Sequence, residues 1–259
     1  TGLLPFFLKK RYILSDEFFA NMKTVFTIHN LMYQGKFSKT SLHRLGYDVE
    51  GDGLNFMRIG MEYADIVTTV SKTYAEEIKY PYFSEGLEDM TTSKKIYGVL
   101  NGIDVIYFNP ERNSSIYVNY NIYTRKDKAK NKMFLQQEMK LPETAETPVI
   151  SMITRLVEGK GMDLVRYNIE ELLKDPVQII ILGSGDKQYE EFFWNLEKKY
   201  PSKFKIKLGY DPVLANKIYA GSDMFLMPSR YEPCGLSQMI AMKFGTIPIV
   251  RETGGLKDT

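Results

Sequence analysis

The chain has 259 residues, of which 44% are hydrophobic and 25% are charged, and its formal net charge is +2 at pH 7. This composition is typical of a globular protein with a sizeable core, and the balanced charge makes nucleic acid or an anionic membrane an unexpected partner. The single cysteine, Cys234, excludes an intrachain disulfide and a Cys-rich metal site, and no apolar run is long enough to span a membrane.

Three apolar runs in the first part of the chain predict buried strands. They cover residues 24–28, 65–70 and 96–100. His29 follows the first run and Asn101 the third, at the strand ends where open parallel sheets bind ligands. His29 fits a ligand contact and also fits a core histidine bonded to the backbone, whereas His43 is expected at the surface.

Helices and loops are expected between these strands. Residues 54–64 and 72–79 have amphipathic spacing, and Ser71 is expected to cap the second helix. Residues 36–52 and 80–95 are polar and aperiodic, which predicts loops.

After a Tyr- and Asn-rich segment at 113–123, which indicates a linker, a charged helix is expected at 125–139, its charges forming a solvated face. Strands and helices then alternate strictly. The expected strands cover residues 148–153, 177–182, 204–208, 224–227 and 247–250. Short apolar strands separated by helices predict a parallel sheet covered on both faces. We therefore predict two domains, 1–112 and 113–259, of which the second is Rossmann-like.

The turn from Pro228 to Leu236 lies between a predicted strand and a predicted helix that begins at Gly235. The first N–H groups of that helix, at Gly235 and Leu236, can bind an anion. Glu232 on the same turn would repel a phosphate but suits sugar hydroxyls, so the turn fits a sugar nucleotide. It also fits a purely structural turn in which Glu232 interacts with the helix dipole.

Arg155 and Lys160 follow the first strand of the second sheet, at the edge where the Glu232 turn and the Thr253–Gly255 turn are also expected. The two cations can hold a diphosphate from two sides, or they can be solvated loop residues. If the reaction is sugar transfer, Arg155, Lys160 and the helix N-terminus must stabilise the leaving group without a metal. No metal or other cofactor is expected.

Two more turns follow strands of this sheet. The segment Gly183-Ser184-Gly185-Asp186 fits a nucleotide pocket, and more simply a tight turn with Asp186 capping the next helix. Tyr210 offers a ring on which a base can stack, or it is an ordinary aromatic residue at the rim.

At these residues the sequence resembles the family of bacterial glycogen synthases and plant starch synthases. The similar stretches are FTIHNLMYQGKF (26–37), ADIVTTVSKTYAEEI (64–78), GVLNGID (98–104), ITRLVEGKGMDLV (153–165), ILGSGD (181–186), GYD (209–211), DMFLMPSRYEPCGLSQ (223–238) and GTIPIVRETGGLKDT (245–259). The resemblance implies an α/β fold of the GT-B type, with two Rossmann-like domains whose parallel sheets face each other across a cleft, both incomplete here. It also implies transfer of glucose from ADP-glucose to the non-reducing end of an α-1,4-glucan, with retention of configuration.

The resemblance further implies roles for individual residues. Arg155 and Lys160 match the residues that grip the donor diphosphate, and Glu232 matches the essential glutamate beside the donor glucose. His29 and Asn101 match polar groups that contact this glucose. Tyr210 matches the residue that stacks on adenine, and Cys234 becomes a pocket neighbour without the role of a nucleophile. The backbone cradle for the phosphate matches Gly235, Leu236, Thr253 and Gly254, and the adjacent Gly255 is also expected to bind the donor.

The sequence also departs from the family. The family's Lys-Thr-Gly-Gly-Leu loop and the segment beyond residue 259 have no counterpart here, so we expect a fragment with little or no activity of its own. The alternatives are a related GT-B enzyme with another nucleotide-sugar donor or acceptor, and a non-catalytic glucan- or nucleotide-binding fragment. The expected compartment is the cytoplasm for a bacterial chain and the plastid for a plant chain.

Overall fold

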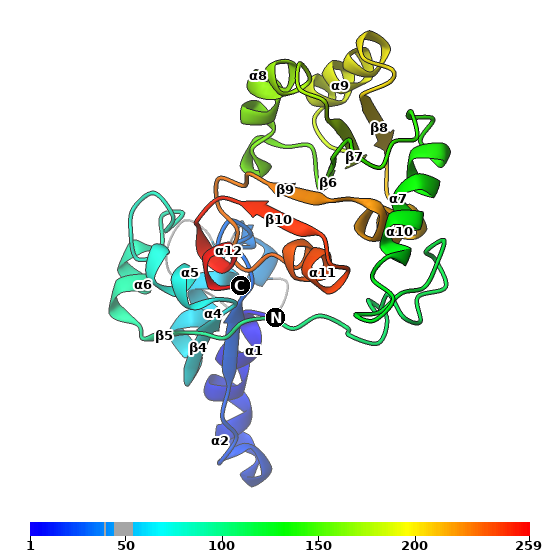
Figure 1. Ribbon diagram of the computed structural model, residues 1–259. Helices are drawn as coiled ribbons and strands as arrows, with labels where there is room; N and C mark the ends of the chain where they lie inside the picture. Colours follow the sequence, from blue (N-terminus) through cyan, green and yellow to red (C-terminus); the bar gives the residue numbers. More distant parts are fainter. Residues whose placement is uncertain (39, 44–53) are drawn as a thin grey trace. The chain divides into compact units, whose positions relative to one another are not determined.

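The computed structural model describes residues 1–38, 40–43 and 54–259. Contacts along the chain define two compact units, Thr1–Asn101 and Gly102–Lys257 (Figure 1). The sequence places this boundary later, at residue 112. In the structure Ile103 and Phe108 already pack against the apolar core of the second unit, which accounts for the earlier division.

The first unit contains a parallel sheet in the order β1-β4-β5. Its elements are α1 (Leu3–Phe7), a π-helical turn (Leu8–Tyr12), α2 (Ile13–Ser15), a 3₁₀ turn (Glu17–Phe19), β1 (Val25–Ile28), β2 (Lys36–Phe37), α3 (Thr40–His43), β3 (Leu54–Asn55), α4 (Phe56–Tyr63), β4 (Ile66–Thr69), α5 (Lys72–Glu77), α6 (Glu88–Ser93) and β5 (Ile96–Gly98). The side chain of Ser71 accepts a hydrogen bond from the backbone N–H of Tyr74, which confirms the predicted cap of α5.

The three strands of this sheet are buried on one face and not on both, so the prediction of fully buried strands is wrong. Ile28 and Val67 point into a core that also contains Met61 of α4 and Ile78 after α5. The alternate positions face outward, and Val25 is 61% exposed. Because strand side chains alternate between faces, helices packed on one face bury only every second residue.

Two segments that were expected to be loops contain regular structure. The 36–52 segment contains β2, which pairs antiparallel with β3, and α3, which lies between these two strands in the sequence. Residues 39 and 44–52 of this segment lie outside the described part of the chain. In the 80–95 segment α6 forms, because Leu87 and Met90 have the spacing that buries one side of a short helix.

The second unit contains a five-stranded parallel sheet in the order β10-β9-β6-β7-β8. Its elements are α7 (Asp127–Glu138), β6 (Val149–Ile153), a 3₁₀ turn (Glu158–Lys160), α8 (Met162–Leu172), β7 (Gln178–Gly183), α9 (Lys187–Lys199), β8 (Phe204–Leu208), α10 (Pro212–Gly221), β9 (Met224–Met227), α11 (Ser237–Lys243), β10 (Ile247–Val250) and α12 (Gly254–Asp258). The predicted alternation of strands and helices is confirmed. Among the described residues, no helix is both long and apolar enough to cross a membrane.

The helices of this unit lie on both faces of the sheet (Figure 1). On one face α8 and α9 cover β6, β7 and β8, with Phe193 and Phe204 fully buried between them. On the other face α7, α10 and α11 pack around Leu135, Ile218 and Phe225. The chain first runs from β6 to β8 and then crosses to β9 on the other side of β6, so that later helices fall on the opposite face.

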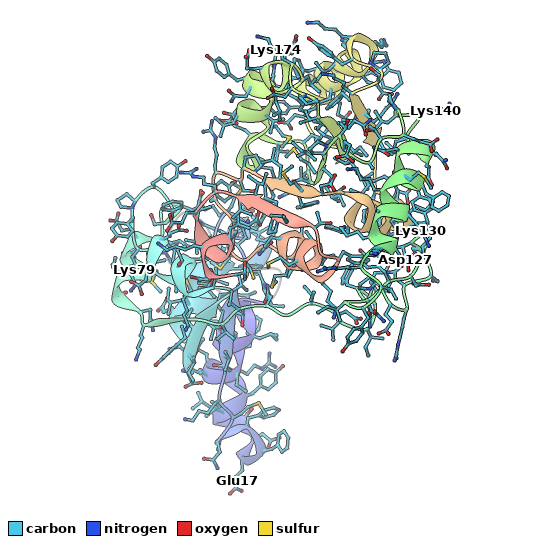
Figure 2. The ribbon with its side chains drawn as sticks, viewed as in Figure 1. Glu17, Lys79, Asp127, Lys130, Lys140 and Lys174 are labelled. Carbon is cyan, nitrogen blue, oxygen red and sulfur yellow. The ribbon has the colours of Figure 1, made fainter. Side chains whose placement is uncertain are left out.

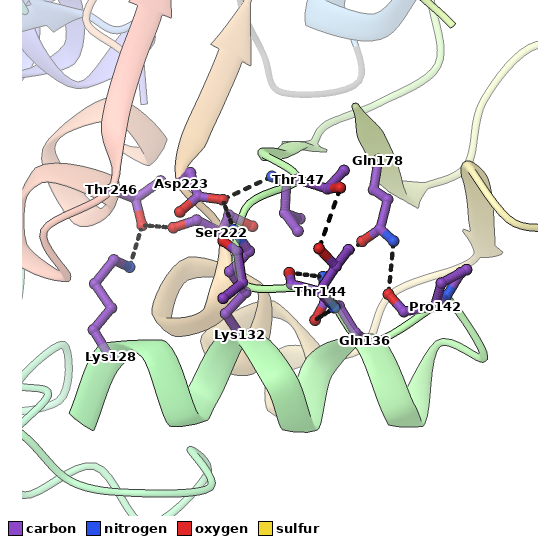
Figure 3. A network of polar contacts seen from close by, with 12 residues as sticks. Lys128, Lys132, Gln136, Pro142, Thr144, Thr147, Gln178, Ser222, Asp223 and Thr246 are labelled. Carbon is purple, nitrogen blue, oxygen red and sulfur yellow. Dashed lines mark hydrogen bonds and ion pairs between the residues drawn. The ribbon is translucent and has the colours of Figure 1, made fainter. Parts of the chain in front are cut away.

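Helix α7 is fastened to the amino-terminal ends of the strands by a polar network (Figure 3). Lys128 Nζ donates to Thr246 Oγ1 and to the Ala220 carbonyl, each at 2.8 Å. Lys132 is buried and pairs with Asp223 at 2.8 Å, and Gln136 bonds to Gln178 at 2.9 Å. The prediction of a wholly solvated charged face is therefore wrong, because two of its lysines bind polar groups at the sheet edge.

Replacing Lys128 with methionine tests the cost of burying this ammonium group. Burial lowers the pKa of Lys128 to about 8, which the Asp223 carboxylate only partly offsets, whereas an unfolded lysine titrates near about 10.4. Between about pH 8 and pH 10 the unfolded chain binds more protons than the folded chain. The contribution of Lys128 to the free energy of unfolding therefore rises by about 2 kcal/mol as the pH increases over this range.

Urea unfolding of the wild type and of Lys128→Met, measured from pH 7 to pH 10, checks this. The wild type should gain stability relative to the variant over this range. Parallel pH dependences of the two proteins would contradict the prediction.

Candidate active site

The sheet of the second unit has one topological switch point, between β6 and β9. These strands are parallel neighbours, but the chain leaves β6 toward β7 and leaves β9 toward β10, in opposite directions along the sheet. The two loops at their carboxyl ends therefore diverge and leave a crevice, which is where open α/β sheets bind ligands.

A cavity of about 170 Å³ occupies this crevice. From the loop after β6 it is lined by Thr154, Arg155 and Lys160. From the loop after β9 it is lined by Ser229, Glu232, Gly235 and Leu236, and from α11 by Ser237. The structure thus brings Arg155, Lys160 and Glu232 to one cavity, as the strand order requires.

Inside the cavity Lys160 and Glu232 form an ion pair. Lys160 Nζ lies 2.5 Å from Glu232 Oε2, and Glu232 is only 7% exposed. The hydroxyl of Ser229 donates to the same oxygen at 3.0 Å. The cation expected to bind phosphate and the carboxylate expected to bind sugar are therefore in direct contact.

The two loops that carry this pair are joined to each other. Arg230 donates its backbone N–H to the Gly159 carbonyl at 3.0 Å. Its guanidinium pairs with Asp163 at 2.6 Å and with Glu158 at 3.1 Å, and the hydrogen bond from Arg230 lowers the pKa of Asp163. Gly161 has φ of +75°, and a Cβ atom there would lie 2.2 Å from the Pro228 carbonyl oxygen. Only glycine allows so close an approach with this backbone.

The glycines of the predicted Gly183–Asp186 turn support the Arg155 loop from the other side. A Cβ atom at Gly183 would lie 1.8 Å from the Thr154 carbonyl oxygen, and Gly185 forms an isolated parallel bridge with Leu156. Asp186 is the N-cap residue of α9, as predicted, but its side chain makes no capping hydrogen bond. Glu190 accepts a hydrogen bond from the N–H of Gly185 instead, at 2.8 Å. The Gly183–Asp186 segment is therefore a tight turn that positions the neighbouring Arg155 loop.

The predicted helix start at Gly235 needs a correction. Helix α11 begins at Ser237, with Leu236 as its N-cap residue, because Gly235 has a left-handed φ of +75° and still belongs to the loop. The N–H groups of Gly235 and Leu236 therefore precede the helix. Both residues nevertheless line the cavity.

The turn after β10 lies behind this loop and does not line the cavity. The N–H of Gly255 donates to the Glu232 carbonyl at 3.0 Å, and a Cβ atom at Gly255 would lie 2.2 Å from the carbonyl oxygen of buried Cys234. Thr253 and Gly254 are also buried. In this structure these positions hold the Glu232 loop from behind.

Three predicted residues lie elsewhere. Tyr210 follows β8 at the far edge of the sheet and is 92% exposed. His29 lines a separate cavity within the first unit, and Asn101 is the last residue of that unit. His29 is exposed, which rules out the alternative of a buried core histidine. His43 is exposed as expected.

Both parts of the chain are similar to known proteins. A family model of the starch synthase catalytic domain matches residues 1–93, and a model of glycosyl transferases group 1 matches residues 135–259. The glycogen synthase of Desulforudis audaxviator is 47% identical, over 100% of this chain and 53% of its own length. That of Thermosipho africanus is also 47% identical, over 100% of this chain and 56% of its own length.

A solved structure resembles the whole chain. The catalytic domain of starch synthase IV from Arabidopsis thaliana, bound to ADP and acarbose, has a TM-score of 0.92 and 34% identity. The alignment covers 100% of this chain and 56% of that one. The chain belongs to the glycogen synthase and starch synthase family. It spans about half the length of the curated relatives that it matches, and the α/β fold of the GT-B type predicted for this family is confirmed.

Two residues of this family member were not assigned a role from the sequence. Ser229 and Arg230 belong to the same motif as Glu232, but the residue types alone do not indicate which residues they bond to. The spacing of Ser229 three residues before Glu232 was a usable signal, since side chains of a tight turn can bond at that distance. The partners of Arg230 lie on another loop, so its contacts depend on the fold.

The described residues contain no group of three or more His, Cys, Asp or Glu side chains able to hold a metal ion. The charges in the cavity come from Arg155, Lys160 and Glu232. Arg155 and Lys160 are positive side chains that can bind an anion in this cavity.

Replacing Gly161 with alanine should separate the two loops. The substitution imposes an unfavourable φ and also a clash with the Pro228 carbonyl, so we expect a loss of about 2–4 kcal/mol in the free energy of unfolding. Gly245→Ala is the matched control, because its φ is +70° and an added Cβ would meet only the Lys128 side chain at 3.8 Å. Chemical denaturation of both variants measures the difference. Equal losses would show that the close approach costs nothing.

Proposed function

We propose that this chain forms the donor site of a retaining glucosyltransferase that transfers glucose from ADP-glucose to the non-reducing end of an α-1,4-glucan. The observation that carries the proposal is the convergence of Arg155, Lys160 and Glu232 on one cavity at the switch point of the second sheet. The similar proteins named glycogen synthase, and the starch synthase IV structure described as bound to ADP and acarbose, support it.

The pyrophosphate of the donor binds the basic side of the cavity. Arg155 offers a planar fork of donors, and Lys160 offers the N–H groups that Glu232 does not use. The backbone N–H groups of Gly235 and Leu236 lie on the same rim. These charges neutralise the phosphate as the bond to glucose breaks, which is the task a metal ion performs in other enzymes.

Glucose binds beside Glu232. Oxygen Oε2 is held by Lys160 and Ser229, whereas Oε1 has no hydrogen-bond partner among the described residues. A free carboxylate oxygen accepts strong hydrogen bonds from sugar hydroxyls. In this proposal residues 1–112 belong to the acceptor-side domain, and His29 and Asn101 keep the role that the family resemblance implies, as polar groups for the glucose.

Transfer then follows with retention of configuration. The bond between the anomeric carbon and the phosphate oxygen breaks, its electrons pass to the phosphate, and an oxocarbenium-like sugar forms. The acceptor hydroxyl adds to the same face and gives its proton to the departing phosphate. Exclusion of water from the site favours transfer over hydrolysis.

The adenine base is assigned to the rim near Tyr210. Neighbouring strands lie about 4.8 Å apart, so the end of β8 is displaced by about 10 Å from the end of β6. This displacement suits a nucleotide that extends from the pyrophosphate along the carboxyl edge of the sheet. A ring that is 92% exposed is available to stack on a base.

Binding measurements with three variants test the site. Arg155→Gln and Lys160→Gln each remove a charge-assisted contact worth about 1.5–3 kcal/mol, so ADP should bind roughly 10- to 150-fold more weakly. Glu232→Gln should weaken ADP-glucose binding by about tenfold but should not weaken ADP binding, since ADP carries no sugar on its second phosphate and loss of the carboxylate charge frees Lys160 for that phosphate. Lys174→Gln, on the exposed outer surface of the same unit (Figure 2), is the control for charge removal.

Isothermal titration calorimetry of the purified chain gives these affinities. Unchanged ADP binding in both the Arg155 and Lys160 variants would refute the site assignment.

A second donor nucleotide distinguishes the proposal from its closest alternative. If Tyr210 stacks on adenine, ADP-glucose should bind more tightly than UDP-glucose, and Tyr210→Ala should reduce this preference by about 1–3 kcal/mol, or roughly 5- to 150-fold. Equal binding of the two donors would favour a related glycosyltransferase of different specificity. Donor binding without turnover, in an assay of this chain joined to the rest of its protein, would favour a non-catalytic binding fragment.

A further inference from the structure

Ser229 is placed to control the orientation of Glu232. Its side chain is buried, with 2% of the residue exposed, and its hydroxyl donates to Glu232 Oε2 at 3.0 Å. Lys160 Nζ donates to this same oxygen at 2.5 Å. Both donors therefore act on one carboxylate oxygen, and the other oxygen, Oε1, has no partner in the described part of the chain.

This asymmetry matters because a carboxylate is free to turn. The terminal torsion of glutamate is broad, so the plane of the carboxylate can tilt at little cost and turn its second oxygen away from a ligand. One flexible lysine follows such a rotation, since an ammonium group on a four-carbon stem is a mobile point charge. The Ser229 hydroxyl is carried by a single side-chain carbon on the same short turn as Glu232, so it can follow such a rotation over a much shorter distance than the Lys160 ammonium.

Ser229 is also the partner that a bound donor leaves in place. If Lys160 donates hydrogen bonds to the pyrophosphate of a bound donor, its ion pair with Glu232 becomes weaker. The Ser229 hydroxyl carries no charge and lies deeper than Lys160, whose side chain is 23% exposed. It can therefore keep its bond to Oε2 throughout the reaction.

We propose that Ser229 is a positioning residue that fixes the Glu232 carboxylate, so that Oε1 stays available for a hydroxyl of the transferred sugar. This inference rests on the proposed function, because it assigns sugar binding to Glu232. It predicts that Ser229 affects recognition of the sugar and leaves recognition of the nucleotide diphosphate unchanged.

The test compares two ligands and four proteins. Calorimetric titrations with ADP-glucose and with ADP are made on the wild type, Ser229→Ala, Glu232→Gln and the double variant. Ser229→Ala should weaken ADP-glucose by about tenfold and change ADP affinity less than twofold. Because Ser229 acts through Glu232, the double variant should bind ADP-glucose as Glu232→Gln does, with no further loss.

Ser222→Ala is the matched control for removing a buried serine hydroxyl. Ser222 is 1% exposed, lies at the opposite edge of the same sheet, and its Oγ atom has no partner in the described residues. This variant should bind both ligands as the wild type does. Thermal unfolding of every variant confirms that it is folded at the titration temperature.

Several results would overturn the inference. An equal loss of ADP and ADP-glucose affinity in Ser229→Ala would show a general structural role, and additive losses in the double variant would show that Ser229 acts independently of Glu232. If Ser229→Ala binds ADP-glucose as the wild type does while Glu232→Gln binds it more weakly, the positioning role of Ser229 is refuted and the proposed function still stands. A wild type that binds neither ligand would refute both.

Discussion

The ion pair between Lys160 and Glu232 is the interaction on which the candidate site depends. It joins a cation from the loop after β6 to a carboxylate from the loop after β9, across the point where the chain reverses its direction along the sheet. Without a ligand the pair neutralises itself, so neither charge is left alone in a largely buried place. In the proposed function, the same two groups face the two chemically different ends of a sugar nucleotide, one anionic and one rich in hydroxyls.

Such a pair requires an exact approach of two loops, and the backbone around it is built for that. Gly161 passes the Pro228 carbonyl at a distance that no side chain permits, and Arg230 ties its own loop to Glu158 and Asp163. The turn at Gly255 holds the Glu232 loop from behind by a backbone hydrogen bond. The charged groups of the cavity are therefore positioned by neighbouring loops, and the strands beneath set only the order of those loops.

Much of this could be predicted from the sequence, for a physical reason. The short apolar strands and the helices between them are local patterns, and parallel pairing then sends the residues that follow each strand to one edge. Arg155, Lys160 and Glu232 were placed together on that argument alone. Contacts that depend on three-dimensional approach were not predictable: the bond from Ser229 to Glu232, the partners of Arg230, and the inward-facing lysines of α7. The burial of the first sheet on only one face was also missed, because an apolar run does not show how many helices cover it.

The energetics of the cavity argue that its polar groups are there for binding. A buried ion pair rarely adds stability, since the cost of removing two charges from water offsets most of their attraction. Here a largely buried carboxylate is combined with a left-handed glycine and with Asp163, whose buried Oδ1 atom has no partner among the described residues. Each of these features is unfavourable or neutral for folding, and all of them lie on the two loops around one cavity or, for Asp163, in the first turn of α8 directly after one of these loops. A fold selected for stability alone would fill this crevice with apolar side chains, as it does on the faces of the same sheet. A cavity kept polar at the switch point instead provides preformed partners for a ligand with opposite chemical requirements at its two ends.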